Sequence, residues 1–379
     1  MFVSRRNFLR TVGIGAAAGV ALQPSMMSAA PLFEPMRPRD LGGPIRLNSN
    51  ENAYGPSPKT TAAIRTASAE ANRYPFDQYE ELVEQIAKLN RVRREQVLMG
   101  CGSTEILRIA AAAFLSKGKQ LIQASPTFEA LEHYARANGA EVVSVPLDKQ
   151  FEHDLDSMLA RVSSSTALVY ICNPNNPSAS ITPRKDLEIF IGNLPSTCHV
   201  LIDEAYHHFA GQSPVYASFL DHPIDNERLI VARTFSKVYG LAGLRLGYGI
   251  ASHTTARQME PYLTEDSVNG IVVRAATVAL ADTESVNDFI KRNAEVRENF
   301  FNQAKVRGLK PIDSQANFVM MDTGHPAQES IEHFRKNNIL IGRRFPAMDT
   351  YIRVSLGTPE EMKEFWRAWD LMPNAATRA

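Results

Sequence analysis

Six short apolar runs, with helical patterns among them, constrain the fold of this chain more than any other feature. The runs are QLIQAS (120–125), AEVVSVPL (140–147), ALVYICN (167–173), HVLIDEA (199–205), RLIVART (228–234) and GYGIAS (247–252). Several are apolar almost throughout, which is typical of strands covered on both faces. The helical pattern TFEALEHYARANG (127–139) stands between the first two. This order predicts an α/β fold with a mostly parallel sheet and helices on both sides.

The remaining patterns divide the chain into four parts. Residues 1–30 are basic and then apolar, and residues 31–58 form a Pro-rich arm that we expect to lie extended on other surfaces. Residues 59–265 carry the α/β pattern of a large domain. Residues 266–379 have longer helical stretches and two strand candidates, NFVMMD (317–322) and YIRVSLG (351–357), around the helical pattern ESIEHFRKNN (329–338). We therefore expect a smaller α+β domain at the C-terminal end.

The first thirty residues have the pattern of an export signal. SRRNFLR (4–10) is basic, and the apolar run behind it is shorter than the roughly 20 residues that cross a membrane. Small residues follow at 28–30, as at a signal cleavage site. The paired Arg5 and Arg6, with Phe8 and Leu9 close behind, resemble a twin-arginine signal, which exports proteins already folded. We expect a periplasmic protein; if this segment is only a basic amphipathic start, the protein stays in the cytoplasm.

Charge and cysteine content narrow the classes of partner. The 379 residues hold 41 Lys plus Arg and 41 Asp plus Glu, so no overall field would attract nucleic acid or an anionic membrane. We expect neither nucleic-acid binding nor stable membrane association. No CxxC or Cys/His cluster is present, so we expect no metal site. Cys101, Cys172 and Cys198 lie in or next to apolar segments and are expected to be buried free thiols.

Polar residues follow the apolar runs. They would lie at the carboxyl ends of the strands, which is where open parallel sheets bind their ligands. Asp203 comes directly after three apolar residues, and Ser236 and Lys237 follow the fifth run. Upstream, GCGSTE (100–105) precedes an apolar helical pattern. Free backbone N–H groups at that helix start, with two hydroxyl side chains, would hold an anion. The alternative there is an ordinary Ser or Thr helix cap with Glu behind it.

A lysine, an acid and an anion site at the ends of one sheet's strands fit the chemistry of pyridoxal phosphate. A lysine forms a Schiff base with an aldehyde. The cofactor also needs a phosphate cradle and an acid against its pyridine nitrogen, so that its ring accepts electrons. Lys237 and Asp203 are placed for the first and last of these tasks. Four residues are available for the phosphate: Ser103, Thr104, Ser236 and Arg245.

The run TFSKVYGLAGLRLGYG (234–249) resembles the cofactor-lysine motif of class I/II, fold-type I aminotransferases, and specifically of the histidinol-phosphate aminotransferase group. Further motifs recur in that family's order and at similar spacing: LNSNENAYGPSP, NRYP, GCGSTE, SPTF, PNNP, DEAY, SQANFV and YIRVSLGT. The resemblance covers residues 45 to about 365. It implies the fold-type I architecture, a large domain built on a mostly parallel sheet and a smaller α+β domain, with pyridoxal 5′-phosphate as cofactor.

The resemblance also implies a role for each matched residue around the cofactor ring. Lys237 would hold the cofactor and shuttle a proton, and Asp203 would pair with the pyridine nitrogen. Tyr206 and Asn176 would bond the phenolic oxygen, and Phe128 would stack on the ring. The phosphate shell would be made by Ser103, Thr104, Ser236 and Arg245.

Other matched residues concern the substrate and a second subunit. Tyr74 matches a tyrosine that reaches the phosphate from the neighbouring subunit, so a homodimer with shared sites is implied. Arg353 matches the arginine that grips the substrate α-carboxylate by a bidentate contact. By the same resemblance, Asn50 and Glu51 of the arm lie near the substrate mouth.

Two departures from the family pattern concern the turn after PNNP and the far end of the substrate. The usual PNNPTG is PNNPSA here. Because Ala179 lacks the conformational freedom of glycine, we expect that turn to differ. Near the family's substrate-phosphate arginine, Gly342 takes the place in one alignment and Arg343 in another. Arg343 or Arg344 reads the far end of the substrate, or the two are a solvated pair beside Phe345.

The resemblance implies a transaminase that moves an amino group from an amino acid or a histidinol-phosphate-like amine to 2-oxoglutarate or pyruvate. Histidine synthesis is cytoplasmic, so an exported enzyme favours another amino acid, and the donor stays open. One alternative is a decarboxylase or lyase resembling threonine-phosphate decarboxylase. Another is a non-catalytic periplasmic ligand-binding protein, which the presence of both Lys237 and Asp203 disfavours. A nicotinamide dehydrogenase is disfavoured because no GxGxxG follows a strand.

Overall fold

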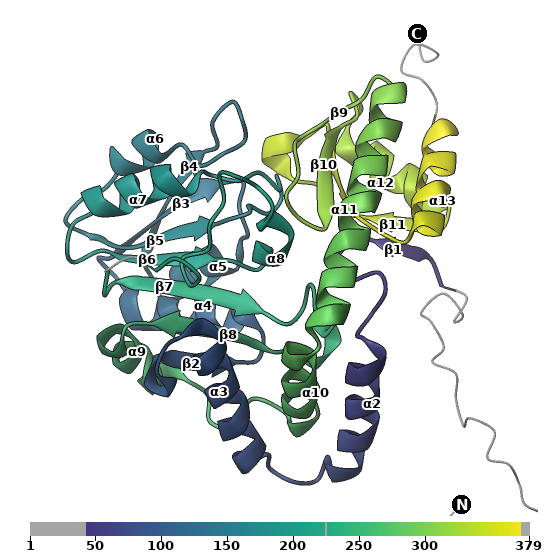
Figure 1. Cartoon of the computed structure of the whole chain (residues 1–379). Helices are drawn as coiled ribbons and strands as arrows, with labels where there is room; N and C mark the ends of the chain where they lie inside the picture. Colours follow the sequence, from purple (N-terminus) through teal and green to yellow (C-terminus); the bar gives the residue numbers. More distant parts are fainter. Residues whose placement is uncertain (1–42, 224–225, 373–379) are drawn as a thin grey trace, which may run out of the picture. The chain divides into compact units, whose positions relative to one another are not determined.

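The computed structural model describes residues 43–223 and 226–372, whose helices and strands are arranged as in Figure 1. The predicted export signal, residues 1–30, lies outside the described residues, as does the predicted arm up to residue 42. By its internal contacts, the chain from Pro44 onward forms one unit. The boundaries of the large and small domains stay predictions.

The largest sheet in the described part of the chain has seven strands in the order β2-β8-β7-β6-β5-β3-β4. Its strands are β2 (Val97–Gly100), β3 (Gln120–Ser125), β4 (Glu141–Pro146), β5 (Thr166–Cys172), β6 (His199–Asp203), β7 (Leu229–Thr234) and β8 (Gly247–Ala251). Strands β3 to β7 are parallel, and only β8 runs antiparallel to its neighbours β7 and β2. The mostly parallel sheet and all six predicted strands are therefore confirmed.

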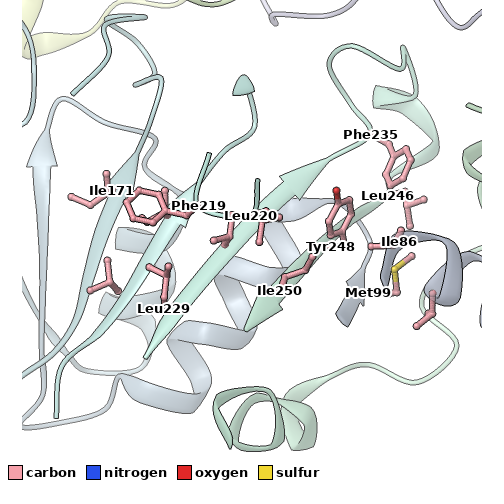
Figure 2. Close-up of a cluster of buried hydrophobic side chains, with 14 of the residues drawn as sticks. Ile86, Met99, Ile171, Phe219, Leu220, Leu229, Phe235, Leu246, Tyr248 and Ile250 are labelled. Atoms are coloured by element: carbon pink, nitrogen blue, oxygen red, sulfur yellow. The ribbon is translucent and has the colours of Figure 1, made fainter. Parts of the chain in front are cut away.

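Helices cover both faces of this sheet. Alternate residues of each strand point to opposite faces, and both sets are apolar, so each face is buried under helices. On one face, Val169, Ile171 and Ile202 belong to a cluster that includes side chains of α3 (Phe76–Asn90), α7 (Arg184–Asn193) and α10 (Gly270–Ala281). Part of it is drawn in Figure 2. On the other face, strand residues pack with α4 (Ser103–Phe114), α5 (Ala130–Ala137) and α9 (His253–Met259). Each fully buried aliphatic side chain stabilises the fold by about 1.5–3 kcal/mol.

Helix α10 lies in the sequence predicted for the small domain but packs with the large sheet. Its buried residues Val272, Val273 and Ala276 belong to the same hydrophobic cluster as Val169, Ile171 and Ile202 of the sheet. The helix packs against α2 (Pro58–Ala67) and α3, as Figure 1 shows. Two shorter helices, α6 (Leu155–Leu159) and α8 (His207–Ala210), also connect strands of the large sheet.

The C-terminal residues form a second, three-stranded antiparallel sheet in the order β12-β10-β9. Its strands are β9 (Lys310–Pro311), β10 (Phe318–Asp322) and β12 (Tyr351–Ser355). Strands β10 and β12 share a hydrophobic cluster with α11 (Thr283–Val306), α12 (Ala327–Lys336) and α13 (Pro359–Asp370). Thr358 is the N-cap of α13 and forms a reciprocal capping box with Glu361, and Pro359 is the first residue of the helix. This α+β arrangement matches the one predicted.

The Pro-rich arm is extended, as expected, and part of it is a strand. Residues of β1 (Ile45–Leu47) pair in parallel with β11 (Ile339–Ile341). The arm is thereby fixed to the C-terminal part of the chain, and its next residues continue toward the ends of the large sheet's strands.

In the turn PNNPSA, Ala179 adopts the left-handed conformation that was expected to require glycine. Ala179 has φ 64°, is completely buried, and its N–H donates to Asn175 O at 2.8 Å. A left-handed alanine costs about 1–2 kcal/mol. Its methyl group packs in a cluster with Tyr206, Phe209 and Val238, and burying one carbon contributes about 0.8 kcal/mol. Burial of the methyl group therefore offsets part of the conformational cost of a left-handed alanine.

The cysteines also differ in part from expectation. Cys172 and Cys198 are buried free thiols as predicted, whereas Cys101 is exposed. Cys101 precedes α4 at the surface, and its N–H donates to the Glu105 carboxylate at 2.5 Å. Within residues 43–223 and 226–372, no three His, Cys, Asp or Glu side chains gather as metal ligands, and no helix is long and apolar enough to span a membrane.

Candidate active site

The polar residues predicted for the site follow neighbouring strands of the large sheet. In the register of β5, β6 and β7, Asp203 pairs with Cys172 on one side and Ala232 on the other. Asn176 follows β5, Asp203 ends β6, and Ser236 and Lys237 follow β7. Because these strands are parallel, their carboxyl ends meet at one edge, where a ligand would bind.

Lys237 lies half-buried at this edge, between the sheet and the arm. Its Nζ donates to Ser49 O at 3.5 Å and lies 5.5 Å from the centre of the Tyr206 ring. Burial, and next the charge of Arg353, lower the pKa of Lys237 to about 8, against the opposing effect of Asp203. A larger share of this amine is therefore neutral, and able to act as nucleophile or base, than of an exposed lysine.

Asp203 is 2% exposed, and both of its oxygens accept hydrogen bonds. Oδ2 accepts from Tyr170 Oη at 3.0 Å, and Oδ1 accepts from Ala205 N at 3.0 Å. Burial raises the pKa of Asp203 to about 6, and these two bonds and the charge of Lys237 oppose that rise. At neutral pH the group is therefore mostly an anion in an apolar setting, where a cation would pair with it strongly.

An anion cradle lies at the start of α4. The N-cap is Gly102 with φ 86°, and in the described structure no side chain caps this helix. Arg245, itself at φ 61°, has its guanidinium beside Gly102 and donates to Ser236 Oγ at 3.2 Å. Ser103 is therefore not the ordinary helix cap. The helix N-terminus, one arginine and a serine converge as in phosphate sites.

Two glycines keep this cradle open. A Cβ at Gly247 would clash with the backbone of Gly102 and Ser103, and one at Gly102 would clash with the Arg245 guanidinium. Without side chains at these positions, β8 lies directly against the first turn of α4. Ser103 and Thr104 are partly exposed there.

Arg353 reaches the same edge from β12. One Nη donates to Asn176 Oδ1 at 2.7 Å and the other to Asn48 O at 2.9 Å. Its Nε is buried and, among the described residues, has no hydrogen-bond partner. The guanidinium lies 5.4 Å from the Phe345 ring centre and 5.6 Å from that of Phe318. A guanidinium with an unused donor between aromatic rings suits a planar anion such as a carboxylate.

The arm supplies Asn50 and Glu51 beside these residues. Asn50 is 2% exposed; its Nδ2 donates to Tyr206 Oη at 3.0 Å and its N–H to Ser355 Oγ at 2.8 Å. Glu51 accepts from Arg46 at 2.7 Å. Asn50 thus joins the large sheet, through Tyr206, to the second sheet, through Ser355.

The structure does not bring every predicted residue into contact with this group. Phe128 is half-buried against the hydrophobic cluster that contains Tyr170 and Cys172. Tyr74 is 68% exposed and stacks on Phe76, with ring centres 5.5 Å apart. It is not bonded to the residues of the cradle within this chain.

The two arginines proposed for the far end of the substrate are exposed and already paired. Arg343 forms a 2.5 Å ion pair with Glu129, directly after Phe128, and Arg344 forms one with Asp349 in its own loop. A Cβ at Gly342 would crowd Arg353 O and Cβ. A residue larger than glycine would therefore clash at position 342. Arg343 lies over the Phe345 ring, which the Arg353 guanidinium also contacts.

Three residues were missed by the sequence analysis. Asn48 and Ser49 contribute backbone carbonyl groups to Arg353 and Lys237, which no side-chain pattern reveals. Tyr170 was read only as part of an apolar strand. The signal in the sequence was a tyrosine within an apolar run that is expected to be fully buried, because a buried tyrosine hydroxyl needs a hydrogen-bond partner.

Comparisons with known proteins agree with this geometry. The family model described as "Aminotransferase class I and II" matches residues 43–368. A histidinol-phosphate aminotransferase of Geobacillus thermodenitrificans is 35% identical over 84% of this chain and 87% of its own.

Two solved structures are also similar. The putative histidinol-phosphate aminotransferase of Erwinia carotovora atroseptica has a TM-score of 0.82 and 33% identity, over 86% of this chain and 94% of that one. The histidinol-phosphate aminotransferase of Sinorhizobium meliloti, solved with pyridoxal-5′-phosphate, has a TM-score of 0.80 and 27% identity, over 90% and 97%. The large mixed sheet of this chain is therefore that of fold-type I enzymes, and the chain belongs to the class I and II aminotransferase family.

Proposed function

We propose that this protein is a pyridoxal-phosphate-dependent aminotransferase that moves the amino group of an amino acid or a histidinol-phosphate-like amine to 2-oxoglutarate or pyruvate. The observation that carries the proposal is the position of Lys237 and Asp203 after adjacent parallel strands, with Arg353 facing the same edge. The family match spans all three residues. A decarboxylase is not favoured, since the relatives at 33–35% identity are named as aminotransferases.

The residues of the site fit the cofactor. The open cradle of α4, Ser236 and Arg245 would hold the phosphate, and Asp203 would face the pyridine nitrogen. Tyr206 and Asn176 would bond the phenolic oxygen, Phe128 would cover the ring, and Lys237 Nζ would bond the aldehyde carbon. When bound, pyridoxal phosphate withdraws electrons from the Cα of the amino donor.

Lys237 Nζ is the group proposed to move the proton. A pKa of about 8 places this amine close to the operating pH, where one group both accepts and returns a proton efficiently. Its contact with Ser49 O holds the amine beside the Tyr206 ring. The amine is thus kept on the side of the site that Arg353 also faces.

Arg353 is proposed to bind the carboxylate common to both substrates. Its unpaired Nε and its two Nη groups present a planar fork, although Asn176 and Asn48 occupy one donor on each Nη. An amine such as histidinol phosphate has no carboxylate. For such a donor, the same guanidinium would meet the phosphate, and the 2-oxo acid would bring its carboxylate in the second half-reaction.

A homodimer with shared sites is proposed from the surface around Tyr74. Tyr74 and Phe76 are 68% and 62% exposed and stack on each other, which is a large apolar surface to leave in water. In a dimer, Tyr74 would reach the phosphate cradle of the partner. Size measurement tests this, and an active monomer would exclude shared sites.

Export to the periplasm is proposed from the first thirty residues alone. Replacing both Arg5 and Arg6 with lysine should keep the protein in the cytoplasm. An unchanged distribution between periplasm and cytoplasm would argue against a twin-arginine signal.

A panel of amino donors tests the proposed function. Histidinol phosphate, an aromatic, an anionic and a small neutral amino acid are each offered with 2-oxoglutarate or pyruvate, and the amino product is quantified. We expect transfer from at least the histidinol-phosphate-like or aromatic donors. Release of carbon dioxide without amino transfer would support a decarboxylase.

The same panel tests the far end of the substrate. If Arg343 reads an anionic group there, Arg343→Gln lowers kcat/KM for anionic donors by about tenfold and leaves neutral donors unchanged. Arg344→Gln is the matched control, because Arg344 pairs with Asp349 within its own loop. Equal losses for all donors would mean that Arg343 does not select the substrate.

A further inference from the structure

Tyr170 is a buried phenol in the middle of strand β5, and its hydroxyl contacts the active site. Its side chain is 0% exposed, and it lies in the hydrophobic cluster on the α4 and α5 face of the sheet. A buried phenol needs a hydrogen-bond partner. Its hydroxyl donates to Asp203 Oδ2 at 3.0 Å, so the partner is the acid of the active site.

The strand register explains this contact. Tyr170 pairs with Leu201 on β6, and Asp203 follows two residues later on the same face. The phenol therefore extends along the sheet toward the strand end. Together with the Ala205 N–H on Oδ1, it gives each carboxylate oxygen one donor. Tyr170 belongs to β5 and Ala205 to the turn after β6, so the carboxylate is bonded by two different segments of the chain.

The other charged or titratable groups around Asp203 do not replace this donor. They are Cys172 on β5, Glu204 and Tyr206 beyond β6, and Lys237 after β7. Burial raises the pKa of both Tyr170 and Cys172 well above its ordinary value, so both stay neutral. Burial also raises the pKa of Asp203; the Tyr170 bond is the largest influence that lowers it, and Glu204 raises it further.

We propose that Tyr170 is a positioning residue for amino transfer, whose hydroxyl fixes the Asp203 carboxylate and keeps it a weak base. This inference rests on the proposed function, since it concerns the proton between Asp203 and the pyridine nitrogen. A weaker base leaves that proton on the nitrogen, where it strengthens electron withdrawal. Without the hydroxyl, Asp203 becomes more basic and draws the proton to itself.

The test compares Tyr170→Phe with the control Tyr216→Phe. Tyr216 is also a tyrosine with a buried hydroxyl, but that hydroxyl has no hydrogen-bond partner among the described residues. The first readout is the titration of Asp203 in the cofactor-free protein. It is monitored through the infrared band of the Asp203 carboxyl group, which is isolated by subtracting the spectrum of Asp203→Asn. We expect the midpoint to rise in Tyr170→Phe and to stay at the wild-type value in Tyr216→Phe.

The second readout uses cofactor labelled with nitrogen-15 at its ring nitrogen. Its NMR shift should move toward the unprotonated value in Tyr170→Phe, and kcat should fall by about tenfold with little change in KM for the 2-oxo acid. An unmoved titration of Asp203, or an unmoved nitrogen shift, would overturn the proposal, whatever the loss of activity. A Tyr170→Phe protein that does not fold would assign the hydroxyl a structural role and also overturn it.

The two proposals fail separately. The titration of Asp203 in the cofactor-free protein does not depend on catalysis. A wild-type protein that transfers no amino group would contradict the proposed function, and an unchanged titration would contradict the role of Tyr170.

Discussion

The guanidinium of Arg353 donates a 2.7 Å hydrogen bond to Asn176 Oδ1, across 177 residues of sequence. Arg353 belongs to the second sheet, and Asn176 follows strand β5 of the large sheet. The proposed carboxylate site is thereby joined to the proposed site of the cofactor's phenolic oxygen. A substrate that binds Arg353 is placed against the residues that hold the cofactor.

Replacing Arg353 with lysine should raise KM for the 2-oxo acid by about tenfold to hundredfold. Lysine keeps the positive charge but loses the planar fork and the bond to Asn176. Cofactor affinity should change much less, because the phosphate cradle is untouched. Arg344→Lys is the control in the neighbouring loop. Steady-state kinetics with an unchanged KM would remove Arg353 from the carboxylate site.

Replacing Gly247 with alanine should weaken cofactor binding strongly. The added methyl group would clash with the backbone of Gly102 and Ser103 and push β8 away from the first turn of α4. Gly243→Ala is the matched control, since a Cβ there meets nothing within 4 Å. Equilibrium binding of pyridoxal phosphate to the cofactor-free variants measures the difference. Equal affinities in both variants would contradict the location of the phosphate site.

Replacing Lys237 with methionine should stabilise the cofactor-free protein at pH 7. Folding lowers the pKa of Lys237 from its ordinary 10.5 to about 8, so below pH 8 the buried charge destabilises the fold. The shift corresponds to about 3 kcal/mol at most, and partial exposure reduces this to roughly 2 kcal/mol.

The sign of the pH dependence follows from the same shift. Between about pH 8 and 10.5 the unfolded chain binds more protons, so wild-type stability rises with pH toward that of the variant. Urea unfolding at several pH values measures the difference. Lys117→Met, at an exposed position, should show no such convergence. A difference that stays constant with pH would contradict the burial of the charge.

The strands of the large sheet were predictable because strands covered on both faces are apolar almost throughout. Strand β2 was not predicted, since its four residues follow a polar segment and form too short a run. Strand β1 was missed for another reason. Its three residues lie in a Pro-rich arm, and the strand they pair with, β11, comes almost three hundred residues later. No local pattern contains that pairing.

The site was predictable where chemistry is carried by side chains at strand ends. The positions of Asp203, Ser236 and Lys237 follow from the rule that carboxyl ends of parallel strands gather ligands. The turn at Ala179 was predicted wrongly, because conformational preference was considered without the packing of its methyl group. Tyr170 could not be assigned to the site from sequence, since only the register of β5 and β6 places it beside Asp203.

The central claim is that Lys237 enables amino transfer, and a labelled single-turnover measurement tests it most directly. Full-length protein with bound cofactor receives a nitrogen-15-labelled amino donor accepted in the panel, and then the 2-oxo acid accepted in the panel. Mass spectrometry counts the labelled amino-acid product, glutamate or alanine, per active site. We predict one labelled product molecule per site for the wild type and a rate lower by orders of magnitude for Lys237→Ala. Wild-type release of the label as ammonia, or transfer by Lys237→Ala at the wild-type rate, would contradict the account.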